Sequence, residues 1–389
     1  MRYFITNVLP HHLSGKYKIS YAAANFSWAL IHSSVFDEVF SIAPLNVSGA
    51  IDDVDMPELV YSDWRKRGKI LQKLAPIKES FLIFRKIKRN SNVWFYNISI
   101  LNIVLFFLCK WFKPSAHCNV IILDIYIPKR KLSLEALFLW AINHANSTIK
   151  LSDSPLFTCK KTECLPGVVP FNAPLFPIIE SVKAEFLLSG LLREDISQIS
   201  LIIRVFFKIK NATLYITGFS EKEEEMKLEC SKYPNIHYYG ELSFNRYMDL
   251  LHKVSFLLST RDPKEKGNQC NFPSKIIEGI LHNRIIISTI KYKQLAGLKY
   301  FFVSSDEDEL KNQIEGSIRM DSVGLIRYAN QSNYAKSMFN PNRWGEIMNS
   351  LEKVRHNNFI FHFKDHNNES ITNHCWFWGL VWWHSHLYV

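Results

Sequence analysis

Phe256-Leu257-Leu258-Ser259-Thr260 and Arg284-Ile285-Ile286-Ile287-Ser288-Thr289 are the two segments that decide the fold. Each is a short run of mostly apolar residues, which predicts a strand buried on both faces. Between them lie a polar loop and Ser274–His282, whose apolar spacing predicts a helix. Two buried strands joined through a helix are typical of a parallel sheet, because parallel neighbours need a crossover connection.

The same alternation of strands and helices covers both halves of the chain. In the second half, predicted strands occupy residues 185–190, 213–218 and 235–239, and predicted helices occupy 196–208, 221–233 and 244–253. In the first half, predicted strands occupy residues 2–8, 35–43, 120–125 and 148–151, and predicted helices occupy 19–32 and 132–145. The pattern predicts an α/β protein of two doubly wound, Rossmann-like domains that face a central cleft.

The densest run of proline and glycine, residues 166–177, marks the predicted domain boundary. We therefore expect an N-terminal domain over residues 1–178 and a C-terminal domain over residues 179–338. In parallel sheets of this kind, ligands bind beyond the carboxyl ends of the strands.

Composition excludes several classes of protein. The 389 residues are 47% apolar and 21% charged, which is ordinary for a globular protein and excludes a disordered or fibrous chain. Seven cysteines at irregular spacings show no metal-ligand pattern and indicate a reducing compartment. No apolar run reaches the roughly 20 residues that a membrane span needs, and the first residues do not resemble a signal peptide. We expect a cytoplasmic protein.

Positive charge is concentrated in the first half of the chain. The net charge is +11, and residues 1–178 carry 21 Lys and Arg against 12 acidic residues, with basic clusters at 64–69 and 85–89. These clusters precede the apolar stretch Ile98–Phe112. One interpretation is peripheral contact with the anionic inner face of a membrane. The other is a solvated basic face beside a buried core helix. No nucleic-acid-binding motif accompanies the charge, so nucleic acid is not an expected partner.

The start of the helix at Ser274 is a candidate anion site. Ser274 can cap the helix, whose free N–H groups and positive dipole end favour a diphosphate. Lys275 adds a positive charge, and Arg261 can approach from the preceding strand. Glu278 lies one turn into the helix, where it can accept hydrogen bonds from ribose hydroxyls. The alternative is an ordinary helix start with a surface lysine and glutamate.

The segment Cys270–Gly279, together with the strand that follows it, resembles the donor-site signature of the family-four group of retaining GT-B glycosyltransferases. That signature reads phenylalanine, proline, serine, lysine, two apolar residues and glutamate, here Phe272 to Glu278. The segments 187–190, 214–218, 235–240 and 247–251 are similar to the preceding strands and helix of that family. The resemblance implies a GT-B fold and a sugar transfer from a nucleotide donor, UDP- or GDP-linked.

Residue roles follow from the resemblance. Glu278 would hold the ribose, Ser274 and Lys275 would face the diphosphate, and Gly190 would allow the phosphates to approach the backbone. The implied donor-binding residues are Gly190, Arg193, Gly218, Arg261, Asn271, Phe272, Pro273, Ser274, Lys275 and Glu278. The family generally needs no metal or other cofactor. Residues 339–358 are similar to its last helix, which returns to the N-terminal domain.

Two departures from the family pattern bear on activity. Cys270 occupies the position where the family often has a second acid, and Glu194 and Asp195 follow Arg193 where a second base is common. These departures motivate one alternative, a catalytically inactive partner of a polysaccharide-assembly complex. A nucleotide-sugar epimerase of the same fold is the other.

Three residues of the first half are candidates for catalysis on the acceptor side. His11 and His12 lie in the loop after the first predicted strand, where a histidine can act as a general base or orient the acceptor. Asp124 ends a strand that can face the same cleft. The alternatives are a surface histidine pair and a helix-capping acid. Tyr96 and Asn97 are weaker candidates for lining the acceptor groove.

The leading hypothesis is a membrane-associated glycosyltransferase of cell-surface polysaccharide biosynthesis. It would transfer a sugar to a lipid-linked or polysaccharide acceptor with retention of configuration. The tail, residues 359–389, crowds five tryptophan and phenylalanine residues into positions 376–383. It is either an interfacial membrane segment or a non-native extension.

Overall fold

The computed structural model describes residues 1–9, 21–42, 58–60, 69–123, 128, 130–152, 154, 156–169, 176–265, 267–268 and 274–353. Residues 1–352 form one compact unit. The aromatic tail, residues 359–389, lies outside the described residues. Within the described part of the chain, no helix is both long enough and apolar enough to cross a bilayer.

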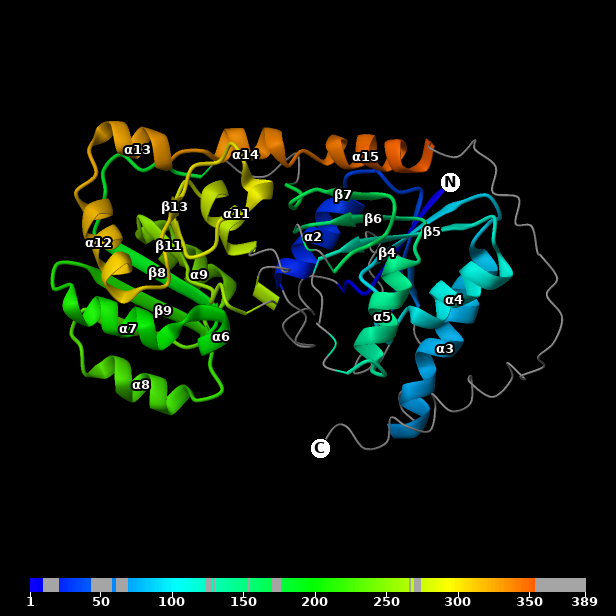
Figure 1. Cartoon of the computed structure of the whole chain (residues 1–389), viewed down its shortest axis with the longest axis horizontal. Helices are drawn as coiled ribbons and strands as arrows, with labels where there is room; N and C mark the ends of the chain where they lie inside the picture. The colour runs from blue at the N-terminus through cyan, green and yellow to red at the C-terminus, as the bar shows by residue number, and fades with distance from the viewer. Residues whose placement is uncertain are drawn as a thin grey trace. The chain divides into compact units, whose positions relative to one another are not determined.

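The first half of the chain forms a seven-stranded sheet in the order β3-β2-β1-β4-β5-β6-β7, in which every neighbouring pair is parallel. The strands are β1 Arg2–Thr6, β2 Glu38–Ile42, β3 Glu58–Val60, β4 Asn92–Tyr96, β5 His117–Ile122, β6 Ser147–Lys150 and β7 Thr162–Cys164. The helices are α2 Tyr21–Ile31, α3 Lys69–Lys86, α4 Ile103–Phe112 and α5 Leu134–Asn143. Figure 1 shows these elements in blue to green.

Alternating side chains of the central strands bury both faces of this sheet. Tyr3 and Phe95 point to one face and join a core with α4, where Phe106 meets Phe95 edge to face with ring centroids 5.6 Å apart. Phe4 and Trp94 point to the other face and join a core with α2. Because both faces are covered, the strands read as continuous apolar runs and not as alternating ones.

The second half forms a six-stranded parallel sheet in the order β10-β9-β8-β11-β12-β13. The strands are β8 Glu185–Leu191, β9 Thr213–Phe219, β10 Ile236–Tyr238, β11 Phe256–Ser259, β12 Ile285–Ser288 and β13 Phe301–Phe302. The helices are α6 Glu194–Ser197, α7 Ile199–Lys208, α8 Glu223–Ser231, α9 Phe244–Lys253, α11 Ser274–Leu281, α12 Glu307–Ile318, α13 Ser322–Tyr328, α14 Ser332–Met338 and α15 Pro341–Lys353. The predicted α/β class with two doubly wound parallel sheets is therefore confirmed.

The elements differ from the sequence prediction at identifiable places. The sequence pattern does not predict β4, although this strand lies between β1 and β5 near the middle of its sheet. The helix predicted over residues 196–208 is divided into α6 and α7 at Gln198, which adopts a left-handed conformation with φ of 49°. By contrast, α9 spans the same residues as the predicted helix 244–253.

Helix α15 is joined to the seven-stranded sheet by polar contacts at low exposure. Glu352 accepts hydrogen bonds from Arg2 Nε at 2.9 Å and from Trp94 Nε1 at 3.0 Å. Trp344, which is fully buried, donates from Nε1 to the carbonyl of Gly167 at 2.9 Å. The contacts of residues 341–352 thus tie the end of this unit to its first strand. The division of the unit at residue 178, and the extent of the helix beyond Lys353, stay predictions.

A pair of histidines, His282 buried and His252 half-buried, lies beside the six-stranded sheet. The His252 Nε2 and His282 Nδ1 atoms are 2.9 Å apart, and the Phe176 ring stacks on His282 with centroids 3.6 Å apart. Arg284, which is buried, donates to the carbonyls of Pro177 and Val254 at 3.0 and 2.8 Å. Burial lowers the pKa of Arg284 to about 10. Burial, followed by the neighbouring His252, lowers the pKa of His282 to about 3.

Acid is therefore expected to weaken the protein at His282. Because the folded pKa lies below the ordinary 6.5, the unfolded chain binds the proton more readily. The contribution of neutral His282 to the free energy of unfolding is fully present well above pH 6.5 and is lost as the pH falls toward 3. Lowering the pH from 7.5 to 5.5 should therefore reduce the free energy of unfolding by about 1 kcal/mol through His282 alone. Denaturant titrations of wild type and His282→Gln at the two pH values should show that the variant loses less stability. The matched control is His237→Gln, an exposed histidine of β10; equal pH dependence of all three proteins would contradict the assignment.

Candidate functional site

Helix α11 begins at Ser274, where the sequence predicts its start. Ser274 is exposed, and the apolar residues Ile276, Ile277 and Ile280 of the same helix are buried against β11 and β12. The helix packs close to the sheet at Gly279, where a Cβ atom would press on Ile286 and Leu257 side chains. The burial of one face directs the opposite face, with Lys275 and Glu278, outward.

Lys275, Glu278 and Tyr247 form a closed polar triangle. Lys275 Nζ lies 2.7 Å from Glu278 Oε2 and donates to Tyr247 Oη at 3.0 Å. Tyr247, which comes from α9, donates to the same Glu278 Oε2 at 2.9 Å. The Lys275 ammonium also lies over the Tyr247 ring, 4.4 Å from its centroid. The side chains of Lys275 and Glu278 remain 33% and 28% exposed, so a ligand can still reach them.

The neighbours of Lys275 favour its charged form. Burial alone lowers the pKa of Lys275, but the Glu278 carboxylate and the Tyr247 hydroxyl outweigh burial, and the pKa is raised. Burial, reinforced by Glu278, raises the pKa of Tyr247 to about 12. Tyr247 is therefore a neutral donor at physiological pH, beside a charged lysine and carboxylate.

The triangle reaches the carboxyl end of β8 through Ser189. Ser189 Oγ lies 3.4 Å from Tyr247 Oη, and Gly190 follows with a φ of 121°. Leaving aside Gly190 itself and its two chain neighbours, no described atom lies within 4 Å of the place where a Gly190 Cβ would stand. The backbone next to the triangle is therefore open to a ligand, as the predicted approach of a phosphate requires.

Gly218 has a different local environment. Its φ is 133°, and a Cβ atom there would overlap the carbonyl of Gly190 in the neighbouring strand. Gly218 N also donates to the Gly240 carbonyl at 2.9 Å. The structure thus shows a close approach of β8 to β9 at this glycine, and contact of Gly218 with a donor stays a prediction.

The two predicted arginines lie on the loops beside this strand edge. Arg193 is held by Asp195, with Nε and Oδ1 2.8 Å apart, and this hydrogen bond, followed by the Asp195 charge, raises the pKa of Arg193. Arg261 Nη1 lies 3.5 Å from Asn268 Oδ1. Asn268 in turn donates to the carbonyl of Asp262 at 3.0 Å and to the carbonyl of Asp195. Asn268 thereby connects the Arg261 loop to the Arg193 loop.

Several predicted site residues cannot be placed. The residues outside the described part of the chain are His11, His12, Asp124, Cys270, Asn271, Phe272 and Pro273. Of the weaker candidates, Asn97 uses its side chain in the fold, because its Oδ1 accepts from Leu123 N at 2.8 Å. Tyr96 is buried beside Phe26.

Sequence reasoning missed Tyr247 and Ser189 as members of the site. Ser189 is adjacent to the predicted glycine turn, and that position was its only signal. Tyr247 lies in a predicted helix 28 residues before Lys275. Its pairing depends on how α9 packs beside α11, which no local pattern reports.

Comparisons with known proteins place the fold. The trehalose-6-phosphate structure from E. coli bound with UDP-2-fluoro glucose matches with a TM-score of 0.63 at 9% identity, over 91% of this chain and 99% of that chain. The α,α-trehalose 6-phosphate synthase of Burkholderia multivorans matches with a TM-score of 0.61 at 8% identity, over 91% and 96%. AviGT4, a glycosyltransferase involved in avilamycin A biosynthesis, matches with a TM-score of 0.52 at 13% identity, over 91% and 99%.

The fold is GT-B. The predicted fold class is therefore confirmed, over nearly the whole length of the compared structures. No protein-family model and no curated protein sequence matches the chain. At identities of 8% to 13% the comparisons establish the GT-B architecture alone.

The two glycines should respond differently to the same substitution. Gly218→Ala should lower the melting temperature far more than Gly190→Ala, because its new methyl group meets a backbone carbonyl. Gly190→Ala meets only the strain of its backbone conformation, about 1–3 kcal/mol. Differential scanning calorimetry of both variants checks this order. Equal losses would show that space beside Gly190 is not open.

Proposed function

We propose that the protein is a retaining glycosyltransferase that binds a nucleotide-sugar donor at the Lys275–Glu278–Tyr247 triangle. The observation that carries the proposal is the position of this partly exposed ion pair, on α11, beside the open backbone at Gly190. A carboxylate for hydroxyl groups and an ammonium for phosphate thus lie on one helix turn. The fold shared with AviGT4, a glycosyltransferase, supports the proposal.

Glu278 is suited to a ribose. Its Oε2 atom accepts from Lys275 and Tyr247, and its Oε1 atom forms no hydrogen bond with another described residue. Hydrogen bonds to a charged carboxylate are stronger than those to a neutral acceptor, about 1.5–3 kcal/mol each. The free oxygen can therefore accept from a ribose hydroxyl while the other keeps the side chain in place.

Lys275 and the first turn of α11 are suited to the diphosphate. The first N–H groups of a helix carry a partial positive charge, and the lysine adds a full one. Because Glu278 already balances part of the lysine charge, the site is less positive than an isolated lysine would make it. Positive groups here would stabilise the nucleoside diphosphate as it leaves, without a metal ion or another cofactor.

The proposal also includes the chemical class of the donor and of the acceptor. A UDP-linked sugar is favoured, because UDP-2-fluoro glucose is bound in one structure of the same fold; a GDP-linked sugar is the other candidate. The acceptor is proposed to be a lipid-linked or polysaccharide chain of cell-surface polysaccharide biosynthesis. His11, His12 and Asp124 are proposed to face it from the N-terminal half, which would contact the inner face of the membrane.

Loss of the carboxylate should weaken donor binding. Glu278→Ala should weaken UDP or GDP binding by about tenfold to a hundredfold, the value of one or two charged hydrogen bonds. Isothermal titration calorimetry with each nucleotide measures the change, and release of nucleoside diphosphate from a panel of nucleotide sugars measures turnover. Glu225→Ala, an exposed glutamate of α8, is the control. Wild-type protein that binds neither nucleotide would rule out the enzyme.

Tyr247 should act through Glu278 and Lys275 and not on the sugar. Tyr247→Phe keeps the ring under Lys275 but removes the hydroxyl, so KM for the donor should rise about fivefold to tenfold with a smaller change in kcat. Tyr239→Phe, at a half-exposed tyrosine of the same half of the chain, should leave both constants unchanged. A fall in kcat with constant KM would contradict this positioning role.

A further inference from the structure

The outer helices of the seven-stranded sheet expose a row of aromatic rings. Phe107 of α4 stacks on Trp111 with centroids 4.7 Å apart, and its ring lies 5.9 Å from that of Trp140 on α5. Trp140 stacks on His144 at 4.1 Å. Trp111 and Trp140 are 57% and 44% exposed. We call Phe107, Trp111, Trp140 and His144 the aromatic row.

The end of α4 and the neighbouring helix α3 expose further apolar side chains. Phe112 follows Trp111 at the end of α4 and is 68% exposed, and Phe81 and Leu82 on α3 are 48% and 41% exposed. Helix α3 packs against α4, and α4 against α5, so the three helices form one layer on this face of the sheet, as Figure 1 shows. Exposed aromatic and apolar residues that gather on one layer, and do not scatter singly, mark an interaction surface.

The part of the chain that carries the aromatic row is rich in basic residues. Residues 69–152 contain 13 Lys and Arg residues but only three acidic residues. Lys113, at the end of α4, donates from Nζ to the carbonyls of Phe84 and Ile87, so the ends of α3 and α4 meet. This contact brings the exposed cluster Arg85, Lys88 and Arg89 to the end of the helix that bears Trp111.

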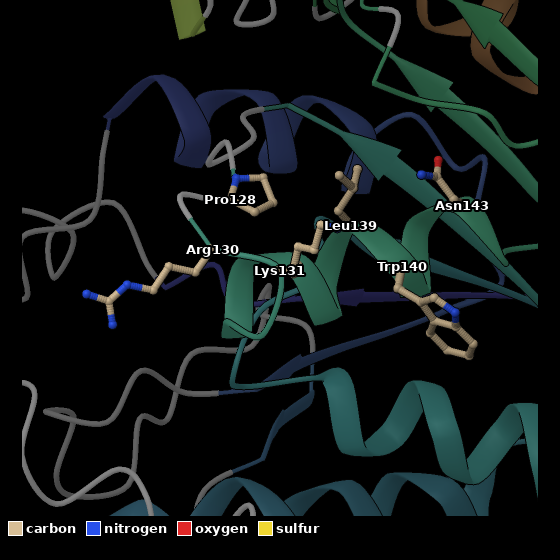
Figure 2. A pocket seen from close by; sticks show the side chains of 7 residues that line it. Pro128, Arg130, Lys131, Leu139, Trp140 and Asn143 are labelled. Atoms are coloured by element: carbon tan, nitrogen blue, oxygen red, sulfur yellow. The ribbon is translucent and has the colours of Figure 1, made fainter.

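A shallow groove extends the charged surface along α5. It measures about 450 Å³ and is lined by Pro128, Arg130, Lys131, Ala136, Leu139, Trp140 and Asn143. Figure 2 shows Arg130 on one side of this view and Trp140 on the other, with Lys131 between them. Five basic residues form no ion pair with another described residue, namely Arg85, Lys88, Arg89, Arg130 and Lys131. These five side chains are exposed, so an anionic partner can reach them.

We propose that the aromatic row and these five basic residues dock the protein on an anionic lipid bilayer. Tryptophan favours the interface of a bilayer, where its ring is apolar and its N–H is hydrated. Lysine and arginine next to such rings meet the phosphate groups of anionic lipids. A protein partner would have to match a broad, nearly acid-free layer of cations, whereas a lipid surface requires only charge and rings.

The inference deepens the proposed function by identifying the face that would hold the enzyme at a lipid-linked acceptor. It does not use the donor triangle, so the two can fail separately. Each cation near an anionic surface strengthens binding about fivefold, and the effect weakens with salt.

The test is sedimentation of the full chain with vesicles. Vesicles of phosphatidylcholine with about 30% phosphatidylglycerol should bind the wild type at least about tenfold more strongly than vesicles of phosphatidylcholine alone. This is the order of magnitude expected when a few cations meet anionic lipids. The variants Trp111→Ser/Trp140→Ser and Arg130→Glu/Lys131→Glu should each reduce that binding about tenfold or more. The controls are Phe207→Ser, an exposed phenylalanine of α7, and Lys210→Glu/Lys227→Glu, two exposed lysines of the second half.

The outcomes separate the two proposals. Thermal unfolding of every variant verifies that it is folded, and UDP and GDP binding verifies the donor site. Vesicle binding without nucleotide binding would keep the docking surface and reject the transferase. Nucleotide binding with equal attachment to neutral and anionic vesicles, with no attachment, or with control variants as defective as the surface variants would overturn the docking surface. Specific capture of one purified protein by the aromatic row, with no lipid binding, would also overturn it.

Discussion

The parallel pairing of every strand is the constraint from which the rest of this structure follows. Parallel neighbours cannot be joined by hairpins, so each connection crosses a face of the sheet and covers it. The strands of each sheet therefore end at one edge, where loops and helix starts gather. β8 has β9 on one side and β11 on the other, and its carboxyl end carries Ser189 and Gly190. The triangle forms at this edge because α9 and α11 both pack beside it.

A partly buried ion pair contributes little to the stability of a fold. The desolvation of Lys275 and Glu278 opposes their attraction, and two apolar residues of similar size would pack on α11 as readily. Tyr247 completes the pair by contributing one donor and one acceptor, which leaves a single carboxylate oxygen for another partner. A polar cluster that leaves one carboxylate oxygen without a partner among the described residues is consistent with the donor site proposed above.

The sequence predicts those parts of the fold that depend on local pattern. α9 and the start of α11 agree with the prediction because apolar spacing and a proline before Ser274 define them. β4 is missed because its five residues follow the basic cluster 85–89, and the charge there conceals a strand whose last four residues are buried. Gln198 divides a predicted helix through a left-handed conformation that carries no signature in a glutamine.

The candidate site shows the same division between local and tertiary information. Lys275 and Glu278 lie three residues apart on one helix, so their proximity follows from helical spacing. Tyr247 and Ser189 join them only because two helices and a strand end meet, and such meetings are set by packing over long sequence separations. The crowding of Gly218 against Gly190 is also tertiary, since it depends on the register of β8 with β9.

The two surfaces proposed for ligands have different physical origins on the chain. The donor triangle uses charges that are mutually compensated, so that its strength comes from geometry at one strand edge. The outer layer of α3, α4 and α5 combines exposed cations such as Arg85 with rings that the core does not bury, although Phe106 and Cys109 on the same α4 are fully buried. One helix that buries one face completely and exposes tryptophan and phenylalanine on the other has more apolar surface than its own sheet can cover. The lipid surface proposed above would cover that apolar surplus and would meet the exposed cations of the same layer.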